Sequence, residues 1–156
     1  MKKFLYVIGI PAMLFFSACY CCEAPRPPDA IYAQKNGVQW TATPMGRLGA
    51  GDTLKISGTG INNGSNLHDT LGFNFKYAGL VNYSITPGLA FYHTRVGNGL
   101  PLLYYKVDTL FNNYLTITGY NQSTNLVTGN FQIKFDSPAD TSTITFLYGN
   151  FKAPLN

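Results

Sequence analysis

The residues that could carry out acid–base chemistry are scarce in this chain of 156 residues, which has 7 acidic residues, 2 histidines and 3 cysteines. A glycosidase needs two carboxylates that face one cleft. The acidic residues between positions 37 and 156 are Asp52, Asp69, Asp108, Asp136 and Asp140. All five occupy expected turns or strand ends, where aspartate is common for structural reasons. We therefore expect a protein that is not an enzyme, with a hydrolase as a remote alternative.

The two histidines form no recognisable metal or nucleophile motif. His68 and Asp69 make a possible pair in an expected loop, and His93 lies in an expected strand. Neither H-x-H nor HExxH occurs there, and no cysteine pair supports them. The segment Ile56-Ser57-Gly58-Thr59-Gly60 is only superficially similar to the G-x-S-x-G turn of hydrolases. We expect no metal and no cofactor.

Binding is better supported than catalysis. Charged residues make up only 12% of the chain, whereas tyrosine, asparagine and threonine are abundant. Sugars stack on aromatic rings while amides meet their hydroxyl groups, so this composition suits a neutral glycan. Four tyrosines are expected on strand faces opposite the core, where they could form a stripe: Tyr92, Tyr104, Tyr114 and Tyr120. The same rings could instead cover a second hydrophobic surface or contact a protein partner.

The tripeptide Asp-Thr-Leu occurs at residues 52–54, 69–71 and 108–110. Aspartate is a good turn acceptor, and Thr-Leu suits the start of a strand. The tripeptide also resembles the O-glycosylation signal of some Gram-negative envelope systems. That resemblance implies Thr53, Thr70 and Thr109 as sugar acceptors.

The N-terminus indicates export. Lys2 and Lys3 precede an apolar run of 13 residues, Phe4–Phe16, which is shorter than the ~20 residues of a spanning helix and typical of a secretory signal. The segment Phe16-Ser17-Ala18-Cys19 resembles the lipobox of bacterial lipoproteins. This resemblance implies a signal peptide over residues 1–18, cleavage before Cys19 and lipid attachment to Cys19. The alternative is an ordinary secreted protein that is cleaved nearby.

Charge and cysteine belong largely to this N-terminal region. The formal net charge of +4 falls by two once Lys2 and Lys3 leave with the signal. No run of basic residues remains to follow a phosphate backbone, so we expect no nucleic-acid partner. All three cysteines lie within the first 22 residues, so the folded part must be held by its core without disulfides. Cys21 and Cys22 are poorer lipid sites because Tyr20 and Cys21 precede them.

The rest of the chain divides into a tether and one domain. Residues 19–36 contain the proline-rich stretch Ala24–Asp29 and are expected to form an extended tether. From residue 37 to 156 apolar residues alternate with polar ones, as in Leu71, Phe73 and Phe75. Turn signals such as Pro87-Gly88 separate these runs every 10–15 residues or so. The pattern predicts an all-β fold, an antiparallel meander of eight to nine strands that forms a sandwich or a partly closed barrel.

Three segments near the C-terminus carry a family resemblance: Leu115–Tyr120, Val127–Phe131 and Leu147–Phe151. With Trp40 and the preceding lipobox, they resemble the small β-rich envelope lipoproteins of Gram-negative bacteria. The resemblance implies an outer-membrane lipoprotein held to the membrane by its lipid. Because the acidic stretch after the lipidated cysteine is reduced to Glu23, both the periplasmic face and the cell surface remain open.

The resemblance carries no catalytic residue. The repeated Gly-Asn-Phe at residues 129–131 and 149–151 is expected to serve packing, since an aromatic ring can cover a glycine in a neighbouring strand. The predicted function is therefore that of a noncatalytic lipoprotein whose domain binds a glycan or a small apolar molecule. The alternative is a structural or accessory subunit of an envelope protein assembly.

Overall fold

The structure is a computed structural model that describes residues 29–61 and 66–156. The predicted signal peptide, Cys19 and most of the predicted tether lie outside the described residues. The described part consists of β-strands apart from turns and one short 3-10 element, η1 (Ala50–Asp52). The strands are β1 (Ala30–Lys35), β2 (Val38–Gly49), β3 (Thr53–Ile61), β4 (Leu67–Lys76), β5 (Asn82–Ser84), β6 (Ala90–Val96), β7 (Pro101–Val107), β8 (Tyr114–Asn121), β9 (Leu126–Asp136) and β10 (Thr143–Pro154).

All ten strands belong to one antiparallel sheet with the order β10-β1-β2-β3-β4-β6-β7-β9-β8-β5. A further pairing between β10 and β9 closes a ring through eight strands, and β8 and β5 extend from β9 outside the ring. The predicted all-β antiparallel fold is confirmed. The described residues form ten strands rather than the predicted eight to nine, and the ring with its side branch is not a clean barrel.

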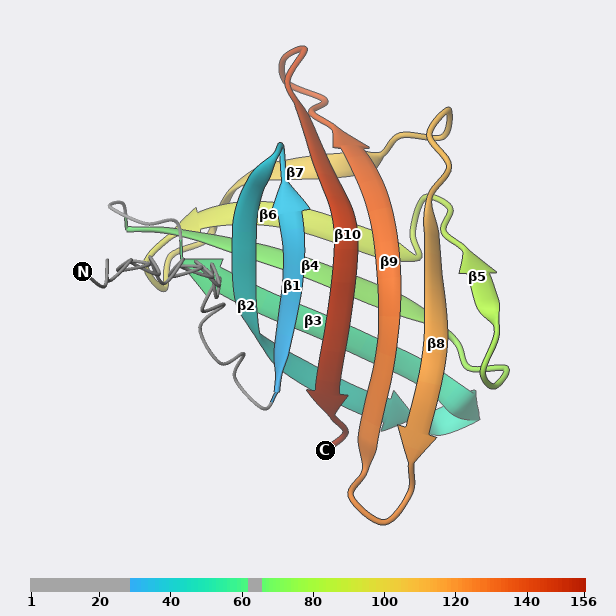
Figure 1. The fold of residues 1–156 in the computed structure, drawn as a ribbon. Helices are drawn as coiled ribbons and strands as arrows, with labels where there is room; N and C mark the ends of the chain where they lie inside the picture. Colours follow the sequence, from blue (N-terminus) through green and yellow to red (C-terminus); the bar gives the residue numbers. More distant parts are fainter. Residues whose placement is uncertain (1–28, 62–65) are drawn as a thin grey trace, which may run out of the picture.

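The ring is folded into two layers that cross each other (Figure 1). The front layer contains β1, β10, β9 and β8, and the back layer contains β3, β4, β6 and β7. Strand β2 belongs to both, because residues Ile31–Lys35 pair with Val38–Ala42 whereas Thr53–Thr59 pair with Thr43–Gly49. Side chains that alternate toward the space between the layers form the core.

Aromatic side chains fill this core. Trp40 meets Phe146 edge to face at 5.1 Å between ring centroids, and Phe73 meets Phe131 in the same way at 5.2 Å. Such edge-to-face contacts suit the quadrupoles of the rings and add to the gain from burial. Phe131, Phe135 and Phe146 are among the side chains that are almost completely buried.

Strand β1 lies within the segment that the sequence assigned to the tether. It pairs with β2 on one side and with β10 on the other, and its Ile31 is fully buried. Asn36 and Gly37 form the turn between β1 and β2, with φ angles of 50° and 81°. Asparagine followed by glycine suits the left-handed geometry of a two-residue hairpin. The sheet therefore begins before residue 37, the predicted start of the domain.

The repeated Gly-Asn-Phe segments lie side by side in β9 and β10. Gly149 is opposite Phe131, Gly129 is opposite Phe151, and Asn150 is opposite Asn130. Each phenyl ring occupies the space that a Cβ on the opposite glycine would need. The expected packing role of the glycines and phenylalanines is therefore what the structure shows, and it leaves the two asparagines adjacent on the outer face.

Candidate functional site

The four predicted tyrosines do not form one stripe. Tyr92 is in the core, where its ring contacts Tyr105, Phe135 and Phe146. Tyr120 is half-buried beside Tyr77. Tyr104 and Tyr114 are accessible, but they lie on different layers of the sheet.

The alternation in β6 has the opposite phase to the predicted one. Tyr92 is predicted to face away from the core, whereas the structure buries both Ala90 and Tyr92. Phe91 faces outward because its ring lies over Gly72 of β4, at the place that a Cβ would occupy. An outward-facing aromatic ring that covers a glycine is therefore mistaken for a core residue, and the predicted inner and outer faces of the strand are exchanged.

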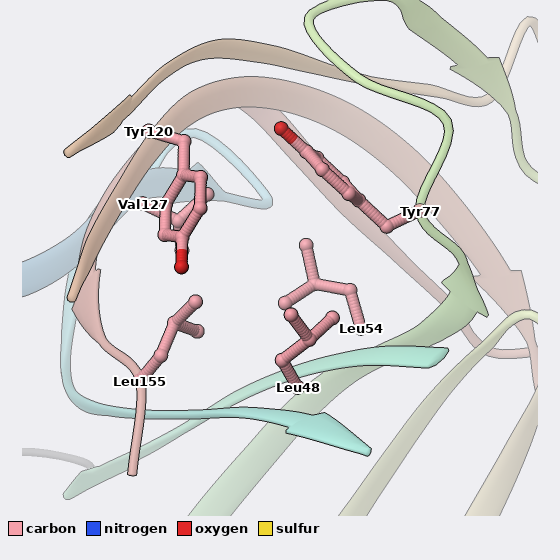
Figure 2. A pocket seen from close by; sticks show the side chains of 6 residues that line it. All are labelled: Leu48, Leu54, Tyr77, Tyr120, Val127 and Leu155. Atoms are coloured by element: carbon pink, nitrogen blue, oxygen red, sulfur yellow. The ribbon is translucent and has the colours of Figure 1, made fainter. Parts of the chain in front are cut away.

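An apolar hollow at the edge of the core is lined by Leu48, Leu54, Tyr77, Tyr120, Val127 and Leu155 (Figure 2). Its volume is only about 10 Å³, close to the minimum for one water molecule. Tyr77 and Tyr120 are 6.1 Å apart between ring centroids, and burial followed by the neighbouring Tyr83 and Tyr120 raises the pKa of Tyr77. This apolar hollow is far smaller than a small-molecule site.

Two surface hollows contain predicted sugar acceptors. Thr53 lines one of about 290 Å³ between Arg47 and Lys55, and Thr109 lines one of about 130 Å³ next to Thr86 and Asn112. Thr70 is different: it is buried, and its hydroxyl oxygen lies 3.2 Å from that of Thr59. Thr53 and Thr109 are therefore accessible to a modifying enzyme, and Thr70 is not.

Two of the carboxylates, Asp69 and Asp108, form structural ion pairs. The fully buried Asp69 forms an ion pair with Lys35, and the Lys35 ammonium lies 5.5 Å from the centroid of the Tyr92 ring. Burial, with the Asp69 charge as a second cause, raises the pKa of the Tyr92 hydroxyl. The contact joins β1 to β4 across the core.

The predicted pairing of His68 with Asp69 is not formed in a loop. Both residues belong to strand β4, where successive side chains point to opposite faces. Asp69 points into the core, so His68 is on the outer side. Among the described residues no group of three or more His, Cys, Asp or Glu is placed to hold a metal ion.

Asp108 is held by two donors. Its carboxylate accepts a hydrogen bond from the Leu110 N–H at 2.8 Å and lies 2.9 Å from Lys134 Nζ. The hydrogen bond from Lys134, followed by that from Leu110, lowers the pKa of Asp108. Together with Asn113, whose amide bonds to the backbone at Asp108 and Lys134, this contact fixes the loop after β7 against β9.

The largest concentration of exposed apolar side chains lies on the β6–β7 hairpin. We call these residues the hairpin surface: Phe91, Val96, Leu100, Leu102, Leu103 and Tyr104. Leu100 is 88% exposed, and Leu102 and Tyr104 are 60% and 62% exposed. Tyr104 is opposite His93, whereas Leu103 is opposite Thr94 and so faces the other side of the hairpin. Isolated exposed apolar residues are normal, but several on one hairpin are typical of an interaction surface.

His93 lies between two rings of this surface. It stacks on Phe91 with 5.9 Å between centroids and an interplanar angle of 11°, and it is 5.9 Å from Tyr104. Burial, followed by the charge of Arg95, lowers the pKa of His93. The lowered pKa favours the neutral imidazole between the two rings.

One edge of β7 has unpaired backbone groups. The strand pairs with β6 from Pro101 to Tyr105, but only Lys106 and Val107 pair with β9 on the other side. Within the described residues, the outer edge of Pro101–Tyr105 has no strand partner. An unpaired edge offers N–H and C=O groups to another strand. The proline at the first position of β7 is typical of such an edge strand.

Sequence reasoning missed the hairpin surface. Its signal was the run Leu100-Pro101-Leu102-Leu103, which breaks the alternation that marks the other strands.

Comparison with protein-family models, with curated proteins and with solved structures finds no match to this chain. The described strands and turns contain no helix long and apolar enough to cross a membrane.

Proposed function

We propose that the chain is a noncatalytic lipoprotein of the bacterial outer membrane whose β-domain docks onto an envelope protein. The proposed anchor is Cys19 behind the signal peptide of residues 1–18, and the domain follows on the tether. The observation that carries the docking role is the coincidence of the exposed hairpin surface with the unpaired edge of β7.

The geometry supports an extended protein segment as the partner. The free N–H and C=O groups of β7 can bond to an added strand, and main-chain bonds of this kind supply affinity. Leu102 and Tyr104 alternate with Leu103 along the strand, so an added strand meets apolar side chains that supply specificity. Aromatic residues are enriched at protein interfaces.

The interior supports a small apolar ligand less well. The hollow beside Tyr77 and Tyr120 holds about 10 Å³, and the core between the layers is filled by aromatic rings. Thr53 and Thr109 remain proposed sugar acceptors, since both side chains are accessible.

Photo-crosslinking in living cells tests the docking role. A photoreactive phenylalanine analogue at Leu102 should give one discrete adduct, because this position faces the proposed partner. The matched control is the same analogue at Gln122, an exposed position in the turn between β8 and β9. Combining the Leu102 analogue with Leu103→Lys should abolish the adduct. Equal adducts from both positions, or none from Leu102, would contradict the proposal.

A further inference from the structure

The outer face of the front layer carries a continuous row of uncharged polar side chains. Register places them next to one another across six strands: β2, β1, β10, β9, β8 and β5. We call them the amide row: Thr41, Tyr32, Asn150, Asn130, Thr116 and Asn82. With neighbouring strands ~4.8 Å apart, the row is about 24 Å long.

The positions on one side of the row are also uncharged. Gln132 is opposite Tyr114, which in turn is opposite Ser84 of β5, and on the same side Gln34 is opposite Gln39. On the other side of the row Lys152 lies opposite Thr128. Tyr114, one of the four predicted tyrosines, therefore belongs to this face. The nearby Lys134 and Lys152 are each paired with an aspartate. A surface without free charge does not favour an anionic ligand.

Packing explains the glycines and phenylalanines of the repeated motif but not its asparagines. Asn130 and Asn150 lie in the middle of long strands and face away from the core. Asparagine is depleted in strands because it neither packs well nor favours the extended backbone. Each side-chain amide offers donors and an acceptor, and the pair doubles this capacity at the centre of the row.

Tyr148 gives an independent indication that this face has a ligand. A bulge in β10 between Phe146 and Gly149 places Tyr148 at φ 53°, in the left-handed region. Its side chain is 74% exposed, so burial does not compensate this conformation. Its carbonyl accepts a hydrogen bond from the Asn150 amide at 2.9 Å. Strained residues that packing does not require occur preferentially at functional sites.

We propose that the amide row and Tyr148 bind an uncharged glycan chain. Apart from Tyr32, whose hydroxyl oxygen is buried, the amides and hydroxyls of the row exchange hydrogen bonds with sugar hydroxyl groups. The exposed ring of Tyr148 stacks on a sugar face. The row lies on the front layer, whereas the hairpin surface belongs to the back layer (Figure 1). Glycan binding and protein docking are therefore separate functions that fail independently.

Affinity electrophoresis of the full chain in detergent tests this proposal. Gels contain dextran, laminarin, mannan or xylan as neutral probes, and alginate as an anionic probe. At least one neutral polysaccharide should retard the protein, and alginate should not. The double variant Asn130→Ala/Asn150→Ala should lower the apparent affinity about tenfold or more, since each lost hydrogen bond contributes a factor of about five.

Two further variants separate binding from folding. Tyr148→Gly should weaken retardation while the melting temperature stays the same or rises, because glycine accepts a positive φ. Tyr104→Ala, on the other layer, should leave retardation unchanged. The proposal is overturned if no neutral polysaccharide retards the wild type, if alginate retards it more strongly, or if the folded asparagine double variant migrates like the wild type.

Discussion

At Gly149 the backbone of β10 passes directly beneath the ring of Phe131. A Cβ built at this position would lie 2.5 Å from Phe131 Cζ and 2.6 Å from both Cε atoms. Because the ring is enclosed by the core, it has little room to move. The aromatic cover of the glycine is thus one of the tightest contacts between β9 and β10.

Gly149→Ala should therefore lower the free energy of unfolding by about 1–3 kcal/mol through overpacking. Denaturant unfolding measures this loss. The matched control is Gly49→Ala, where the nearest atom to a new Cβ would be 3.7 Å away and φ is −96°. The control should change stability by less than about 0.5 kcal/mol. Equal effects of the two alanines would show that the Phe131 contact is not restrictive.

Asp108 should make stability depend on pH at the acidic end. Hydrogen bonds from Lys134 and Leu110 lower its pKa in the folded state, so the unfolded state binds the proton at a higher pH. The contribution of Asp108 to the free energy of unfolding is therefore complete above its pKa in the unfolded state, about 3.9. This contribution is lost as the pH falls through its lower pKa in the folded state.

The variant Asp108→Asn should be less stable than the wild type at pH 7 and should lose less stability between about pH 5 and pH 2.5. Melting temperatures at a series of pH values measure both effects. The other carboxylates are unchanged in the variant, so their acid sensitivity cancels in the comparison. If the melting temperatures of the two proteins fell by the same amount between about pH 5 and pH 2.5, the assigned role of Asp108 would be refuted.

At the scale of elements, the ring is closed most weakly between β7 and β9. Only Lys106 and Val107 of β7 pair with β9, whereas β10 and β9 pair almost throughout their length. The backbone groups of β7 that point away from β6 should therefore exchange with solvent readily.

Hydrogen–deuterium exchange should show fast exchange for the amides in Leu102–Tyr105 that face away from β6. The amides of Gly129–Ile133 in β9, between β8 and β10, should exchange much more slowly. If a partner strand adds to β7, the fast amides should become protected when the partner is present. Uniform slow exchange across β7 in the isolated protein would contradict an unpaired edge.

Alternation predicted most of the strands but not how they meet. The apolar positions of β4 and β9, such as Phe73 and Phe131, face the core as expected. Strand β1 was missed because its Ile31 and Ala33 follow a proline-rich stretch. The phase of β6 was wrong because the residue that Phe91 covers, Gly72, is in another strand. Contacts between strands that are far apart in the sequence cannot be predicted from the local alternation of apolar and polar residues.

The candidate surfaces were beyond sequence reasoning for the same reason. Asn130 and Asn150 were visible as part of a repeat, yet their adjacency depends on the register between β9 and β10. The unpaired edge of β7 depends on where β9 ends. The prediction of a neutral polar ligand rests on composition alone, because low charge and abundant asparagine, threonine and tyrosine are properties that do not depend on topology.

At the scale of the whole molecule, the proposed lipid anchor determines where both surfaces act. Cys19→Ala should release the protein from membranes and abolish labelling with a fatty acid, because lipid attachment to this sulfur would be lost. Cys21→Ala is the matched control and should remain membrane-bound and labelled. Fractionation of cells grown with labelled palmitate measures both. Continued labelling of the Cys19 variant would show that the anchor lies elsewhere.

The pairing of the first described strand with the last has a consequence for the timing of folding. Ile31 of β1 pairs with Phe151 of β10, and closing so long a loop is entropically costly and slow. During translation the ring lacks its final strand until β10 has emerged, so β1 and β9 each keep an open edge. A chain that cannot complete its fold early remains unfolded for longer, and an unfolded chain is what the export proposed above requires.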